Sequence, residues 1–302
     1  MSRRSAIQII GNALFCSGGG VSRLAAQPIV NLPAEFAAIE ATSGGRLGVY
    51  GLDTGSGNII GHRAESRFGM CSTFKFLLAA AVLHEHDHGR LDLNTLIPFT
   101  KADLIANSPI TKANIRNGAM TIRDLAHATQ LTSDNTAANL LLKKLGGPTG
   151  FTAMLRAMGD PITRVDRIEP AMNLVPAGEL RDTTTPRAIA ETAARLLTGQ
   201  VLTPSSLAML IEWMIETQTG LKRIRANVPK NWRVGDKTGT GSHPSMPNKY
   251  NDVAILMPPN RAPITVACYY EGPAYFAEMR AEDEAVLAKV GEVVVGWVSA
   301  SN

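Results

Sequence analysis

The chain has 302 residues, of which 45% are hydrophobic and 19% charged, a composition that suits one large buried core or two fused ones. The formal net charge is +4, but Arg3, Arg4 and Arg23 lie in the first 26 residues, where there is no acidic residue, so the rest of the chain is nearly neutral. This balance argues against a nucleic-acid surface, and no segment beyond the N-terminus is long and apolar enough to span a membrane.

The N-terminus reads "SRRSAIQIIGNALF", a twin-arginine start followed by a modest apolar stretch, and "RLAAQP" offers small residues for cleavage near Ala26. We expect residues 1–26 to be an export signal peptide, with the mature protein periplasmic or secreted. The alternative is a disordered tail, because Gly11 and Asn12 interrupt the apolar stretch.

The mature chain begins with a helical pattern, "PAEFAAIEATSGG", followed by "RLGVYGLD" and "NIIGHRA", which read as a β-hairpin. Residues 72–217 show one helical pattern after another, several ending in Gly. Strand patterns return in "WRVGDKTG", "NDVAILMP" and "PITVACYYEG", and a helical pattern closes the chain. The periodicities therefore predict an α/β protein of the α+β type, with a sheet domain from residues 27–68 and 218–302 and an all-helical domain from residues 69–217.

Cys16 falls in the predicted signal peptide, which leaves two cysteines in the mature chain. Cys71 and Cys268 both lie in apolar sequence, so we expect two buried free thiols. The alternative is a disulfide between them.

The segment "CSTFK" places Ser72 and Lys75 three residues apart at the start of an apolar helical run, so both lie on one face, one turn from each other. Taken alone, the pair reads as a helix cap and a lysine whose charged end reaches water. In the chemical interpretation, a desolvated lysine accepts the serine proton and makes the hydroxyl a nucleophile, and the N–H groups of the helix start stabilise developing negative charge.

Two further triplets favour the chemical interpretation. "SDN" at residues 133–135 opens a predicted helix, and "KTG" at residues 237–239 ends a predicted strand. Each triplet alone is a common helix start or strand end. The three motifs in this order rarely occur together by chance.

With "STFK", "SDN" and "KTG" the sequence resembles the class A β-lactamases and the penicillin-binding proteins. The loop "RIEPAMNLVPAGELRDTTTP", residues 167–186, is similar to the omega loop of class A β-lactamases, which we place at residues 167–182. The resemblance covers nearly the whole mature chain. It implies an antiparallel five-stranded sheet flanked by N- and C-terminal helices and packed against an all-helical domain.

The resemblance also implies catalytic roles. Ser72 attacks the lactam carbonyl, and the backbone N–H groups of Ser72 and Thr240 hold the oxyanion. Ser133 passes a proton to the lactam nitrogen, with Lys75 and Lys237 keeping its hydroxyl polarised. The base for acylation is either Lys75 or Glu169 acting through water.

Binding roles follow by the same resemblance. Asn135 hydrogen-bonds the side-chain amide of the substrate, and Glu169 with Asn173 holds the hydrolytic water. Lys237, Thr238 and Arg223 hold the substrate carboxylate, Arg223 being matched only through "RIRANVP".

Two structural features of the loop are expected in addition. Arg167 and Asp182 form the ion pair that closes its base, although on spacing alone each reads as an exposed charge. The Glu169–Pro170 peptide bond is cis.

A possible metal site is the cluster "HEHDHG", residues 84–89. It lies at the end of an apolar helix with Gly89 as its C-cap, where histidines are favoured by the helix dipole, and no ligand-spaced partners follow. We therefore expect neither a metal nor a cofactor.

Three departures bear on specificity. The stretch "TGSHPSMPNKY" after "KTG" is about four residues longer than the family pattern and predicts an extended rim over the site. Asn107 stands where many relatives carry an aromatic residue, and Gly241 where some carbapenem-hydrolysing relatives carry a cysteine bonded to the one before the nucleophile.

Three functions remain open on the motifs. The first is a secreted, monomeric serine β-lactamase acting on a small-molecule β-lactam. The second is a penicillin-binding carboxypeptidase, which would not need Glu169 and Asn173, and the third is a β-lactam receptor that is acylated once, for which membrane helices are expected.

Overall fold

The computed structural model describes residues 32–199 and 201–300, so the predicted signal peptide and Cys16 lie outside the described residues. The longer helices are α1 (Leu32–Ser43), α2 (Phe74–Asp87), α3 (Pro109–Ala113), α4 (Ile122–Leu131), α5 (Asn135–Lys144), α6 (Gly147–Ala157), α7 (Pro186–Leu197), α8 (Pro204–Ile215) and α9 (Ala281–Ala300). The strands are β1 (Arg46–Asp53), β2 (Ile59–His62), β3 (Phe68–Gly69), β4 (Leu96–Pro98), β5 (Ala119–Thr121), β6 (Thr183–Thr184), β7 (Arg233–His243), β8 (Met246–Met257) and β9 (Ile264–Glu271).

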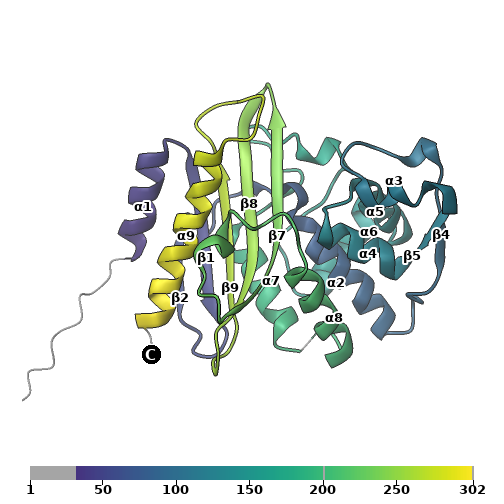
Figure 1. Cartoon of the computed structure of the whole chain (residues 1–302), viewed down its shortest axis with the longest axis horizontal. Helices are drawn as coiled ribbons and strands as arrows, with labels where there is room; N and C mark the ends of the chain where they lie inside the picture. The colour runs from purple at the N-terminus through teal and green to yellow at the C-terminus, as the bar shows by residue number, and fades with distance from the viewer. Residues whose placement is uncertain (1–31, 200, 301–302) are drawn as a thin grey trace, which may run out of the picture. The chain divides into compact units, whose positions relative to one another are not determined.

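Five strands form one antiparallel sheet in the order β2-β1-β9-β8-β7, so segments from both ends of the chain pair side by side. Helices α1 and α9 cover one face, and α7 packs on the other, toward the remaining helices (Figure 1). The predicted fold class, with its five-stranded sheet flanked by the terminal helices, is confirmed. The division into two domains stays a prediction.

Side chains alternate between two cores along the sheet strands, as the period of two in a strand requires. Val49, Cys268 and Tyr270 pack toward α1 and α9, whereas Tyr50 and Tyr269 pack toward the helical side. Both faces of the central strands are therefore buried, which explains their nearly continuous apolar sequence.

Helix α2 lies at the centre of the helical region, and its residues 74–83 are all buried. A helix that is buried all round needs no polar face, which accounts for the unbroken run from Phe76 to Leu83. The 3-10 turn that leads into this helix, Cys71–Thr73, lies against the edge strand β7.

Strand β7 corrects the predicted strand end. It continues past "KTG" to His243, because Gly239 provides a close approach to another segment, not a chain stop: a Cβ there would lie 2.5 Å from the carbonyl oxygen of Met70. The stretch predicted to form an extended rim is a longer β7–β8 hairpin with Pro244 and Ser245 at its turn.

Smaller elements escaped the sequence analysis. The pairs β3–β6 and β4–β5 are two-stranded sheets of two or three residues per strand, too short to show a period.

Cys71 and Cys268 are both buried free thiols, as predicted. Within the described part of the chain, no helix has the length and apolar character needed to cross a membrane.

Candidate active site

Ser72 lies in a short 3-10 turn, Cys71–Thr73, that leads directly into α2. A buried hydrogen bond fixes this turn: the Thr73 hydroxyl donates to the Met70 carbonyl over 2.9 Å. Ser72 is partly exposed while both neighbours are buried, so its hydroxyl is the one reactive group that the turn presents.

Lys75 is fully buried beneath Ser72, one helical turn further on. Its Nζ lies 2.9 Å from Ser72 Oγ, 3.0 Å from Glu169 Oε1, 3.3 Å from Ser133 Oγ and 2.5 Å from Asn135 Oδ1. Burial lowers the pKa of this amine, and the Glu169 carboxylate opposes the shift. The Lys75 amine on the buried face is therefore paired with Glu169, while its burial makes the proton easier to remove.

Glu169 points inward from the omega loop and is only 2% exposed. One carboxylate oxygen lies 3.3 Å from Ser72 Oγ, and the other accepts a hydrogen bond of 2.5 Å from the side-chain amide of Asn173. The Glu169–Pro170 peptide bond is cis, as predicted. Nucleophile, lysine and carboxylate thus form one contiguous cluster.

The sequence analysis missed Asn139, which fixes the backbone of Glu169. Its side-chain amide donates to the Glu169 carbonyl, and its side-chain oxygen accepts from the Glu169 N–H, both over 2.9 Å. Asn139 lies one turn after Asn135 on the same face of α5, and this spacing was the available signal.

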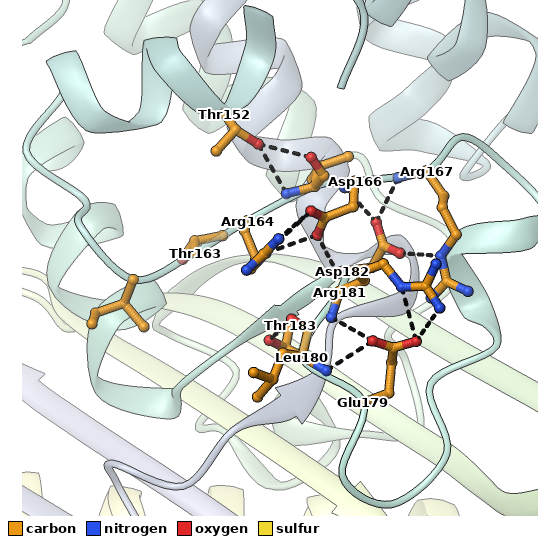
Figure 2. Close-up of polar contacts among 12 residues, drawn as sticks. Thr152, Thr163, Arg164, Asp166, Arg167, Glu179, Leu180, Arg181, Asp182 and Thr183 are labelled. Atoms are coloured by element: carbon orange, nitrogen blue, oxygen red, sulfur yellow. Dashed lines mark hydrogen bonds and ion pairs between the residues drawn. The ribbon is translucent and has the colours of Figure 1, made fainter. Parts of the chain in front are cut away.

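The neck of the omega loop is held by two aspartates that each accept the other's backbone N–H (Figure 2). Asp182 accepts from the N–H of Asp166 at 2.7 Å and forms the predicted ion pair with Arg167 at 2.5 Å. Asp166 accepts from the N–H of Asp182 at 3.0 Å and from the Arg164 guanidinium. The predicted pair is confirmed, and the sequence analysis missed the second aspartate.

Asp182 also reaches the nucleophile segment. Its carbonyl accepts from the Met70 N–H over 3.1 Å, where β3 and β6 pair beside it. The same residue thus contacts the chain just before Ser72 and the loop that carries Glu169.

Ser133 precedes α5 in a left-handed conformation, with φ of 60°. The next residue, Asp134, caps α5 through the N–H of Ala137 and also accepts from the N–H of Thr111 on α3, both over 2.9 Å. This double cap fixes the turn, so the Ser133 hydroxyl faces Lys75.

The opposite wall of the site is the edge strand β7. Lys237 is fully buried, and its Nζ donates to the Thr238 carbonyl over 2.8 Å. Burial, together with the like charge of Lys75, lowers the pKa of Lys237 to about 7. Its charge therefore changes within the physiological range.

Arg223 lies behind this wall and is only 3% exposed. Its guanidinium donates to the carbonyls of Gly239 and Asn251 and to Thr240 Oγ1, and pairs with Glu284 at 3.2 Å. These hydrogen bonds fix the guanidinium to the protein. Arg223 still lines the cavity beside Thr240, so its positive charge acts on this side of the site.

These elements enclose a cavity of about 450 Å³. The predicted residues that line it are Ser72, Ser133, Asn135, Asn173, Arg223, Thr238 and Thr240, while Lys75, Glu169 and Lys237 are buried beside it. Asn107 at the predicted entrance also lines it. Thr132, Thr219 and Met279 line it as well, and no sequence motif indicated them, whereas Ser242 belongs to the stretch predicted to form a rim over the site.

The histidine cluster has local partners. The ring Nδ1 of His86 contacts the Leu91 carbonyl at 3.1 Å, and that of His88 contacts the His84 carbonyl at 2.7 Å. Among residues 32–199 and 201–300, no group of three His, Cys, Asp or Glu side chains is placed to hold a metal ion.

A serine hydroxyl against a buried lysine and a buried carboxylate, in a cavity between an antiparallel sheet and a helical region, defines a serine hydrolase that forms a covalent acyl-enzyme. A model of the beta-lactamase enzyme family matches residues 31–298. The chain belongs to this family, and within it to the class A serine β-lactamases, which hydrolyse the β-lactam ring.

Relatives of known identity agree over most of the chain. Beta-lactamase FAR-1 of Nocardia farcinica is 45% identical over 87% of this chain and 81% of its own length, and beta-lactamase L2 of Stenotrophomonas maltophilia is 45% identical over 86% and 83%. The crystal structure of a β-lactamase from Burkholderia vietnamiensis is 46% identical, with a TM-score of 0.84 over 90% of this chain and 98% of its own. An ancestral class A β-lactamase is 47% identical, with a TM-score of 0.83 over 88% and 99%.

Proposed function

We propose that this β-lactamase opens the lactam ring by attack of Ser72 and releases the product with a water activated by Glu169. The observation that carries this proposal is the position of the Lys75 amine, which lies within 3.0 Å of both Ser72 Oγ and Glu169 Oε1. One nucleophile is thus served by two groups that can accept a proton.

In acylation, Ser72 Oγ bonds to the lactam carbonyl carbon as its proton passes to a base. Lys75 and Glu169 both lie within hydrogen-bonding distance of this oxygen, and burial favours the neutral amine of Lys75. The backbone N–H groups of Ser72 and Thr240 stabilise the oxyanion, and the close approach of β7 to the nucleophile turn supports this pairing.

Cleavage of the C–N bond requires a proton for the departing nitrogen. Ser133 is suited to supply it, because its hydroxyl lies 3.3 Å from the Lys75 amine, from which it can be reprotonated. Lys237 adds positive charge on the β7 side. Asn135 lines the cavity, donates one side-chain N–H to the Ala106 carbonyl and accepts from Lys75 Nζ through its oxygen, so its second N–H and the remaining lone pair of the oxygen are left for a substrate amide.

The substrate carboxylate fits against the β7 wall. Thr238 and Thr240 present hydroxyls to the cavity, and Lys237 and Arg223 supply charge behind them. Thr219 extends this group, since its hydroxyl lies 2.6 Å from that of Thr238. A carboxylate here is met by hydroxyl donors and two buried cations.

Deacylation depends on Glu169 and Asn173, whose side chains hydrogen-bond to each other beside Ser72. A penicillin-binding carboxypeptidase and an acyl-stable receptor need no such carboxylate. Its position against the nucleophile favours the hydrolase.

For the biological setting, we infer that residues 1–26 direct export to the periplasm or the medium and that the mature enzyme acts there as a monomer. Hydrolysis before the drug reaches its target confers resistance. The twin arginine of the N-terminal sequence supports export.

A time course with a chromogenic cephalosporin in large excess tests this function. We expect many turnovers per enzyme molecule, unchanged by EDTA, because the proposed steps use only protein side chains and water. A single burst equal to the enzyme concentration would indicate a receptor, and a loss in EDTA restored by zinc would revive the histidine cluster.

A pH profile tests the role of Lys237. Its pKa of about 7 means that raising the pH through 7 removes the charge proposed to hold the substrate carboxylate. We expect kcat/KM to fall on this alkaline side by up to about tenfold per pH unit, since kcat/KM reports the free enzyme. The Lys237→Arg variant stays charged at these pH values, so its kcat/KM should not fall on the alkaline side. If kcat/KM of the wild-type enzyme stays constant up to pH 9, the proposed role of Lys237 in holding the substrate carboxylate is contradicted.

A further inference from the structure

The cavity wall contains one apolar side chain. Of the twelve residues that line the cavity, eleven are polar and the other is Met279. Its exposed fraction is 41%, so its thioether is available for contact. An apolar group in an otherwise polar wall selects for an apolar part of whatever binds there.

The segment that carries Met279, residues 272–280, is held by Asn248, which is fully buried in the extended β7–β8 hairpin. The Asn248 side-chain amide donates to the Phe276 carbonyl over 2.8 Å, and its oxygen accepts from the Phe276 N–H at 3.3 Å. Its backbone pairs with Gly272 and Ala274. The segment is therefore fixed to the hairpin at several points.

The residue after Met279 is fixed as well. The Arg280 N–H donates to the Tyr250 hydroxyl over 3.0 Å, and the Arg280 guanidinium lies 4.1 Å above the centre of the Phe276 ring. With anchors on both sides, Met279 has a defined backbone position, and only its side chain can adapt.

Met279 lies on the carboxylate side of the cavity. The Arg280 carbonyl accepts from the N–H of Glu284, and Glu284 pairs with Arg223, which donates to Thr240 Oγ1. Met279 therefore belongs to the wall made by β7 and Arg223, opposite the omega loop.

In a β-lactam, the carboxylate is carried by the ring fused to the lactam. The neighbouring ring carbon bears two methyl groups in penicillins and the 3-substituent in cephalosporins. A side chain beside the carboxylate site meets these groups, not the acyl side chain.

We propose that Met279 is a specificity-determining residue that contacts the substituent next to the substrate carboxylate and favours an apolar substituent over a cationic one. This inference rests on the proposed function. An apolar substituent gains contact with the thioether, whereas a cationic one loses hydration against it without gaining a partner.

The test uses two cephalosporins with the same acyl side chain, one with a 3-methyl group and one with a cationic 3-pyridiniummethyl group. We expect Met279→Ser to lower the ratio of their kcat/KM values, methyl over pyridinium, by about three- to tenfold, the effect of losing part of one apolar contact. Met279→Glu should lower the ratio further, because its carboxylate attracts the cation. Met279→Leu, which keeps the apolar volume, should leave the ratio within about twofold.

Tyr275→Ser is the matched control. Tyr275 is an exposed residue of the same segment outside the cavity lining, so its replacement should leave the ratio unchanged. Thermal melting of each variant establishes that it is folded.

A ratio that stays constant in both Met279→Ser and Met279→Glu, with normal turnover of both drugs, would overturn the inference and leave the proposed function intact. Failure of the wild-type enzyme to turn over either drug would instead overturn the proposed function.

Discussion

Glu169→Ala is expected to react with a penicillin and then stop as a stable adduct whose mass equals protein plus intact drug, attached at Ser72. Removing a positioned general base typically costs about 10² to 10⁴ in rate, or roughly 3 to 5 kcal/mol of barrier. Acylation keeps a second base, because Lys75 Nζ lies 2.9 Å from Ser72 Oγ. Deacylation has only Glu169, so the loss falls mainly on that step.

The variant also changes Lys75. The Glu169 carboxylate holds the pKa of this amine up against the effect of burial, so its removal leaves the amine neutral more of the time. Acylation should therefore persist even though the carboxylate is gone.

Intact-protein mass spectrometry after mixing, with steady-state turnover in parallel, measures both steps. Glu179→Ala is the matched control, because Glu179 is a carboxylate of the same loop that pairs with Arg181 away from Ser72. The Glu179→Ala variant should hydrolyse the penicillin at the wild-type rate. Rapid turnover by Glu169→Ala, or no adduct within hours from folded protein, would show that another carboxylate is the base.

Ser72→Ala is expected to abolish turnover and covalent labelling together. Loss of the nucleophile in a serine hydrolase costs on the order of 10⁶ in kcat. The neighbouring Thr73 does not substitute for it, because its hydroxyl is buried and bonded to the Met70 carbonyl.

Labelling with a penicillin followed by peptide mapping checks this result. Ser245→Ala, at the exposed hairpin turn, should keep both turnover and the label at Ser72. A label that persists in Ser72→Ala would assign the nucleophile to another residue.

Much of the fold could be predicted because its long elements have clear periods. The alternation in residues 46–53 matches β1 residue by residue, and the free thiols, the cis bond before Pro170 and the Arg167–Asp182 pair are all confirmed. The cis bond and the ion pair came from the resemblance, since spacing alone could not indicate them.

The remainder depends on contacts between distant segments. The strand predicted to end with "KTG" continues through Gly239, where the Met70 backbone beside it leaves no room for a larger side chain. Asn139 and Met279 belong to no motif, and only the folded chain brings them to Glu169 and to the cavity. The catalytic roles themselves stay predictions until the variants are measured.

The paired aspartates at the loop neck make residues 166–182 a closed ring, whose joint, Asp182, also contacts the segment before Ser72. The spacing between nucleophile and base is set at this joint and by Asn139, not by the outer arc, where Gly178 and Leu180 are exposed. Residues of the outer arc can therefore be substituted while Asp182 and Asn139 keep the distance between Ser72 and Glu169 unchanged. Over evolutionary time the outer arc of the loop can thus diverge in sequence while the hydrolytic chemistry is conserved.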